Sequence, residues 1–111
     1  MYQQTLTIDG YAVNLTQGQS GMGARFTLTC PDDAPESLPK AVLTRTQNWC
    51  AKLMGHIPGS TIRATRFGHK IEVEALGAPW KRLEDGFPEL EEELGTIPGE
   101  VGRQTQPQAA G

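Results

Sequence analysis

Two cysteines and two histidines are the side chains of this 111-residue sequence that could hold a metal ion or pair a nucleophile with a base. Cys30, Cys50, His56 and His69 are spaced as C-x19-C-x5-H-x12-H. This pattern lacks the closely spaced C-x2-C or H-x3-H pairs that hold a tetrahedral zinc ion. We expect no metal site, and we expect both thiols to be buried and unpaired in a reducing cytoplasm.

A nucleophilic active site needs a Ser, Thr or Cys beside a base, and a third group that orients the base. Cys50 and His56 could meet near the end of a predicted helix, but Cys50 falls on the apolar face of that helix. The glycines of residues 18–23 precede a strand and are not followed by Lys-Ser or Lys-Thr, so they do not match a phosphate loop. The sequence predicts no catalytic residues, no cofactor and no enzymatic activity.

Alternation of apolar and polar residues predicts the strands that would position any site. Residues 5–16 form two strands joined by an Asp-Gly pair, which is typical of a two-residue type I′ turn. This turn sets the register, so that Leu6 lies opposite Val13 on one apolar face. Residues 25–30 alternate in the same way and predict a third strand.

A helix and a second hairpin complete the predicted domain. Residues 37–54 place apolar side chains on about half of a helical wheel, with Ser37 as the N-cap and Gly55 as the stop. Residues 60–76 then predict two more strands with a turn between them. The order β-β-β-α-β-β predicts a small α+β domain over residues 1–78, with an antiparallel sheet covered on one face by one helix.

Charge divides the sequence into two parts. The formal net charge is -3, but residues 1–82 hold nine Lys and Arg against six Asp and Glu, while residues 83–111 hold one Arg against seven acids. We predict an acidic amphipathic appendage with a short helix over residues 79–98, and a disordered tail over residues 99–111.

Large apolar residues recur at helical spacing in this acidic segment, although Gly86 and Pro88 interrupt a continuous helix. Large anchors surrounded by charge are typical of protein-docking segments. We therefore predict a protein-binding site formed by Trp80, Leu83, Phe87, Leu90, Glu91, Glu92, Glu93 and Leu94. In the alternative that stays open, Trp80 and Phe87 fold back to cover the part of the sheet that one helix leaves bare.

These features favour a non-enzymatic inhibitor or adaptor, of the kind encoded by phages and mobile elements, that docks on a protein partner. Residues 89–93 would face a basic surface of that partner which otherwise holds nucleic acid. No stretch approaches the roughly 18 apolar residues of a membrane span, and the first residues lack the pattern of a signal peptide. We expect a cytoplasmic protein without a membrane partner.

Direct binding of nucleic acid is the alternative function. The second hairpin carries Arg63, Arg66, Phe67, His69 and Lys70 at or near its tip. The basic side chains would contact phosphates and Phe67 would stack on a base, with the acidic tail as an internal competitor. A third possibility is assembly through a sheet edge, because neither edge strand has protection beyond isolated charges and glycine.

Overall fold

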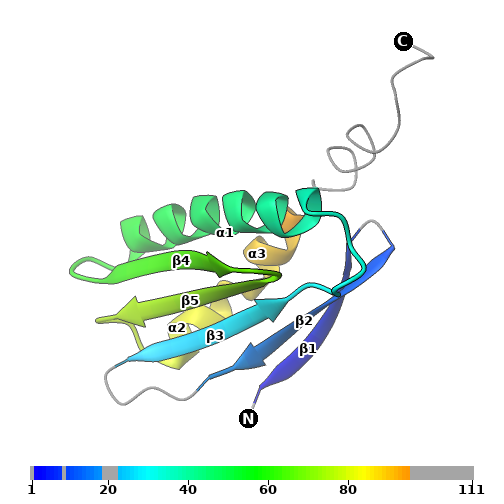
Figure 1. Ribbon diagram of the computed structural model, residues 1–111. Helices are drawn as coiled ribbons and strands as arrows, with labels where there is room; N and C mark the ends of the chain where they lie inside the picture. The colour runs from blue at the N-terminus through cyan, green and yellow to red at the C-terminus, as the bar shows by residue number, and fades with distance from the viewer. Residues whose placement is uncertain (1, 9, 19–22, 96–111) are drawn as a thin grey trace.

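Five strands form one antiparallel sheet in the computed structural model, which describes residues 2–8, 10–18 and 23–95. The strands are β1 (Gln3–Ile8), β2 (Tyr11–Gln17), β3 (Ala24–Thr29), β4 (Thr61–Phe67) and β5 (Lys70–Leu76), in the spatial order β1-β2-β3-β5-β4. Helix α1 (Ser37–His56) connects β3 to β4, and helices α2 (Trp80–Asp85) and α3 (Phe87–Leu94) follow β5 (Figure 1). The predicted α+β class and the antiparallel sheet are confirmed.

The first hairpin has the predicted register. Leu6 lies opposite Val13, and Ile8 lies opposite Tyr11. Gly10 has a φ of +85°, in the left-handed region that a type I′ turn requires. Because opposed residues share a face, this register turns the apolar side chains of both strands toward the helices.

The second hairpin is tighter than predicted. Phe67 and Lys70 lie opposite each other at the ends of β4 and β5, so the turn consists of Gly68 and His69 alone. Gly68 supplies the left-handed conformation, with a φ of +61°. Phe67 therefore belongs to a strand, and its side chain points away from the helices together with that of Lys70.

Helix α1 extends two residues beyond its predicted end. It passes through Gly55 and ends at His56, while Glu36 at its N-cap position makes no side-chain capping hydrogen bond. The packing of Leu38, Val42 and Trp49, which are almost completely buried, holds the helix on the sheet. This burial outweighs a glycine in the last turn, which costs only about 1 kcal/mol.

The sheet is covered on one face, as predicted, but in the described chain α2 and α3 join α1 on that face. Helix α1 packs on β4 and β5, α2 packs on β3, and α3 packs on α1 (Figure 1). The predicted short helix is two helices joined at Gly86. The predicted tail over residues 99–111 lies outside the described residues.

An aromatic cluster joins the two groups of helices. The ring of Phe26 on β3 lies 5.8 Å from that of Trp49 and 5.2 Å from that of Phe87, both edge to face. Trp49 Nε1 donates a hydrogen bond of 2.8 Å to the carbonyl oxygen of Gly86. The break between α2 and α3 is thus one of the points at which α1 is bonded to them.

Candidate functional site

The apolar half of the predicted protein-binding site is part of the core. Leu83, Phe87, Leu90 and Leu94 are each at most 3% exposed. Trp80 is half-buried and packs against the rings of Tyr2 and Phe87, with centroids 5.8 and 5.5 Å away. These side chains are therefore not available to a partner in this conformation. The intramolecular alternative is the arrangement found, because five strands present more apolar surface than one helix covers.

The acidic half of that site faces outward. Glu91 and Glu92 are exposed, as is Glu89 in the first turn of α3, whereas Glu93 is half-buried. Glu93 forms an ion pair with Lys52 on α1, and Glu91 accepts a hydrogen bond from the Gln4 side chain on β1. The apolar face of α3 is anchored in the core, and its carboxylates are consequently held on a fixed frame.

A cleft runs between α1 and α3, and we call it the α1–α3 cleft. It has a volume of about 290 Å³ and is lined by Trp49, Lys52, Glu89, Glu92 and Glu93. A second hollow, of about 300 Å³, adjoins it at Glu89 and is lined by Leu53, His56, Arg82, Asp85, Gly86 and Glu89. The cleft thus combines three carboxylates with one ammonium group.

The electrostatics of the cleft are acidic. The hydrogen bond and charge of Glu93 raise the pKa of Lys52 above its ordinary value, and the charges of Glu89 and Glu92 add to this effect. Carboxylates three and four positions apart on one helix repel each other. Among the described carboxylates Lys52 bonds directly to that of Glu93 only, so Glu89 and Glu92 leave the cleft with a surplus of negative charge.

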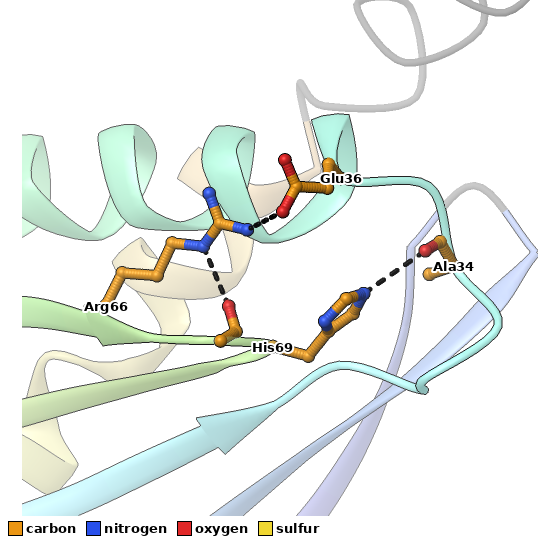
Figure 2. Close-up of polar contacts among 5 residues, drawn as sticks. Ala34, Glu36, Arg66 and His69 are labelled. Carbon is orange, nitrogen blue, oxygen red and sulfur yellow. Dashed lines mark hydrogen bonds and ion pairs between the residues drawn. The ribbon is translucent and has the colours of Figure 1, made fainter.

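The tip of the second hairpin is tied to the rest of the domain. Arg66 donates from Nε to the Gly68 carbonyl oxygen at 2.7 Å and from Nη2 to Glu36 Oε1 at 3.0 Å (Figure 2). His69 Nε2 donates to the Ala34 carbonyl oxygen at 3.2 Å (Figure 2). Arg66 and His69 therefore hold the tip against the segment before α1.

The remaining candidates for nucleic-acid contact lie on the outer face of the sheet, which no described helix covers. Phe67 is 59% exposed, and Arg63 and Lys70 are exposed beside it. A shallow hollow of about 190 Å³ is lined by Arg63, Thr65, Phe67, Glu72 and Glu74. Glu74 pairs with Arg25 at 2.8 Å and with Arg63 at 3.8 Å, so carboxylates neutralise part of this basic surface.

Neither thiol is set up for nucleophilic chemistry. Cys30 and Cys50 are free and buried, and burial raises their pKa to about 11 and about 12 respectively. Both stay protonated near neutral pH, and a protonated thiol is a poor nucleophile. Within the described residues, no three His, Cys, Asp or Glu side chains are grouped so as to hold a metal ion.

Two contacts that shape these surfaces were missed from the sequence. The Trp49 bond to Gly86 joins residues 37 positions apart, and the Arg66 pair with Glu36 joins residues 30 apart. No local pattern indicates either contact. The available signal for the first contact was Gly86, which divides the apolar stripe of residues 80–94. From the sequence alone, this glycine indicates only an interruption of the helix.

The comparisons with known proteins add no functional information. The chain has no significant match to a protein-family model, a curated protein or a solved structure. In the part of the chain that the structure describes, no helix is long and apolar enough to cross a bilayer.

Proposed function

We propose that this chain is a non-enzymatic cytoplasmic binding protein, an inhibitor or adaptor, that docks on a basic surface of a protein partner through the α1–α3 cleft. The single observation that carries this proposal is the surplus of carboxylates in that cleft. Glu89 and Glu92 line it together with the Lys52–Glu93 pair. This replaces the predicted docking through apolar anchors, because those anchors lie in the core.

The rigid frame of the cleft supports specific binding. The carboxylates stand on α3, whose other face buries Phe87, Leu90 and Leu94. A backbone that is already held in place loses less conformational freedom on binding than a flexible segment does. A preorganised acidic surface therefore suits an inhibitor or adaptor better than an unstructured acidic tail does.

The charge of the cleft selects the chemistry of the partner. A Lys or Arg side chain entering the cleft relieves the repulsion among Glu89, Glu92 and Glu93. Its aliphatic stem can lie along apolar wall atoms while its charge meets the carboxylates. Basic surfaces with several such side chains are those that bind nucleic-acid phosphates, so the chain would compete with nucleic acid for its partner.

The test is an affinity purification from nuclease-treated lysate of the native cell, followed by direct binding to the recovered protein. We compare the full chain with E89Q/E92Q, which removes two cleft charges and keeps the size of both side chains. The matched control is D32N/D33N, which removes two exposed charges from the loop before α1. We expect the first variant to weaken binding about tenfold or more and the control to bind normally.

Equal binding by both variants and the unchanged chain would refute docking at the cleft. Recovery of nucleic acid alone, in samples without nuclease, would favour the second function below. Raising the salt concentration should weaken binding of the unchanged chain more steeply than that of E89Q/E92Q, since fewer charge pairs remain in the variant.

The second candidate function, direct binding of nucleic acid, is favoured by the exposed Phe67. This ring lies opposite Lys70 at the end of the hairpin, on a sheet face that no described helix covers, an arrangement that suits stacking on a single-stranded base. Arg66 and His69 no longer contribute, since they bind groups of the protein. The acidic residues of α2 and α3 are part of the folded domain, and residues 96–111 contain only Glu100 and Arg103 as charged groups, so a competing acidic tail has little support.

This second candidate predicts that a labelled single-stranded oligonucleotide binds at low salt and that F67A/K70Q weakens binding about tenfold. L76A/K40Q is the control, because it removes one exposed apolar side chain and one exposed charge away from the tip. Removal of residues 84–111 is not a valid test, since it deletes Phe87, Leu90 and Leu94 from the core. No change in fluorescence anisotropy at low salt would rule this function out.

A further inference from the structure

The two edge strands of the sheet differ in how they are protected from pairing. Strand β4 carries Arg63 and Arg66, and Arg66 is fixed toward Glu36 on its inner side. Strand β1, with the sequence QQTLTI, has no charge, no proline and no glycine. Charges, proline and bulges are the usual means by which proteins prevent edge pairing, and β1 has no charge or proline to do so.

The backbone of β1 offers a regular set of bonding groups at its free edge. In an antiparallel pair, alternate residues bond to the neighbouring strand. The Tyr2 carbonyl oxygen accepts a hydrogen bond of 3.0 Å from Gln17 N, so Gln4, Leu6 and Ile8 direct their N–H and C=O groups toward β2. The N–H and C=O groups of Gln3, Thr5 and Thr7 therefore point away from the sheet.

The outer side of this edge is open in the described part of the chain, whereas on the inner side the Gln4 side chain bonds to Glu91 of α3. Gln3, Thr5 and Thr7 are exposed and place their side chains on the outer face. On the inner face, Leu6 packs against the core but is only half-buried. A further strand beside β1 would pair the free backbone groups and cover the remaining apolar surface of Leu6.

We propose that β1 is a homodimerisation edge, where a second copy of this chain adds its own β1 antiparallel across a twofold axis at Thr5. This register places Thr5 opposite Thr5 of the other copy, and Gln3 opposite Thr7. All outward backbone groups of both strands are then paired, and the two sheets become continuous. The partner is a second copy because the strand is complementary to itself in this register and carries no charge that would repel its twin.

The dimer also fits the side chains on both faces. Threonine side chains opposite each other on a sheet pair favourably. Leu6 of one copy lies opposite Gln4 of the other, so its exposed surface is covered by an aliphatic stem. The inference does not rest on the α1–α3 cleft, since none of the residues that line the cleft belongs to β1.

The first experiment measures mass by sedimentation equilibrium between about 1 µM and about 1 mM, the range in which weak dimers form. We expect the full chain to rise from 12.1 kDa toward twice this mass. T5K places two lysines directly opposite each other at the twofold axis and should raise the dissociation constant about tenfold. T65K is the matched control, because it puts the same side chain on the outer face of the other edge strand.

Amide hydrogen exchange supplies the second readout, on the unchanged chain. As concentration rises, we expect the amides of Thr5 and Thr7 to become protected, while those of Leu6 and Ile8 are protected throughout by β2. A 12.1 kDa mass at every concentration overturns the proposal. The proposal is also overturned if T65K abolishes self-association while T5K leaves it intact. It is overturned too if the chain self-associates but the Thr5 amide gains no protection from hydrogen exchange. Protection of Thr5 only in the presence of a different protein overturns it as well, and assigns the edge to that protein.

Discussion

Helix α1 and the α2–α3 pair cover the same face of the sheet in different ways. Helix α1 is one helix of 20 residues, whereas α2 and α3 have 6 and 8 residues and meet at Gly86. The outward side of α1 carries Lys40 and Lys52, and that of α3 carries glutamates. Opposite charges on adjoining helices form the Lys52–Glu93 pair and leave the cleft acidic on the α3 side.

The comparison teaches that a broken helix can be as firmly packed as a continuous one. The break at Gly86 frees a carbonyl oxygen that accepts the indole N–H of Trp49. It also lets the stripe from Leu83 to Leu94 follow the curved surface formed by α1 and the sheet. A break in a helix therefore does not prevent its apolar side chains from being buried.

Replacement of Trp49 by alanine should have the largest effect on this arrangement. Trp49 is 1% exposed and contacts both groups of helices, so we expect W49A to lower the free energy of unfolding by about 4 kcal/mol. Urea denaturation followed by circular dichroism measures this change. W49F keeps a ring but loses the N–H, and should cost about 1 to 2 kcal/mol. An equal loss in both variants would mean that the bond to Gly86, rather than the bulk of the ring, joins the helices.

Leu90 tests whether α3 belongs to the core. This side chain is completely buried, so L90A should lower the free energy of unfolding by about 3 kcal/mol. The control is L76A, since Leu76 is 40% exposed and should cost less than about 1 kcal/mol. A change below about 0.5 kcal/mol in L90A would contradict the packing of α3 and restore a free docking segment.

The thiols report how well the helices seal the inner face. Burial holds the pKa of Cys50 on α1 at about 12, so labelling by iodoacetamide at pH 8 should be about 100-fold slower in the folded chain than in urea. Mass spectrometry of peptides follows Cys30 and Cys50 separately. Rapid labelling of Cys50 at a rate unaffected by L90A would show that α1 opens without α3.

The smallest effect is expected from the link between α1 and α3 at Lys52. Its pKa is raised above 10.5, chiefly by the hydrogen bond to Glu93, so the folded state holds this proton more tightly than the unfolded state does. The resulting stability is fully present below about pH 10.5 and is lost as pH rises through the pKa of the folded state. We expect the difference in melting temperature between the unchanged chain and K52Q to stay constant up to about pH 10.5 and to shrink as the pH rises further. A constant difference would mean that Lys52 acts through packing alone.

The strands and α1 could be predicted because their signals are local. The register of Leu6 with Val13 follows from a two-residue turn and an alternating pattern. The limits of α1 were predicted to within two residues, from one apolar face and a loop rich in proline before it. Each of these features depends on neighbours within a few positions along the chain.

The candidate site was predicted less well because its surroundings come from distant parts of the chain. An apolar stripe such as Leu83, Phe87 and Leu90 shows that something covers it, but the spacing is the same for a partner and for the chain's own sheet. The width of the sheet, which one helix cannot cover, was the deciding property. The contacts of Arg66 and His69 could not be predicted for a related reason, since Glu36 and Ala34 approach them only in the fold.

The position of α3 along the chain has a consequence for biosynthesis. Phe26 and Trp49 are made before the side chains that enclose them, which extend to Leu94. A nascent chain that has released only the strands and α1 from the ribosome still exposes this aromatic surface to water. The core closes only after α3 emerges, so the domain is expected to complete its folding only then and to rely on protection from aggregation until then.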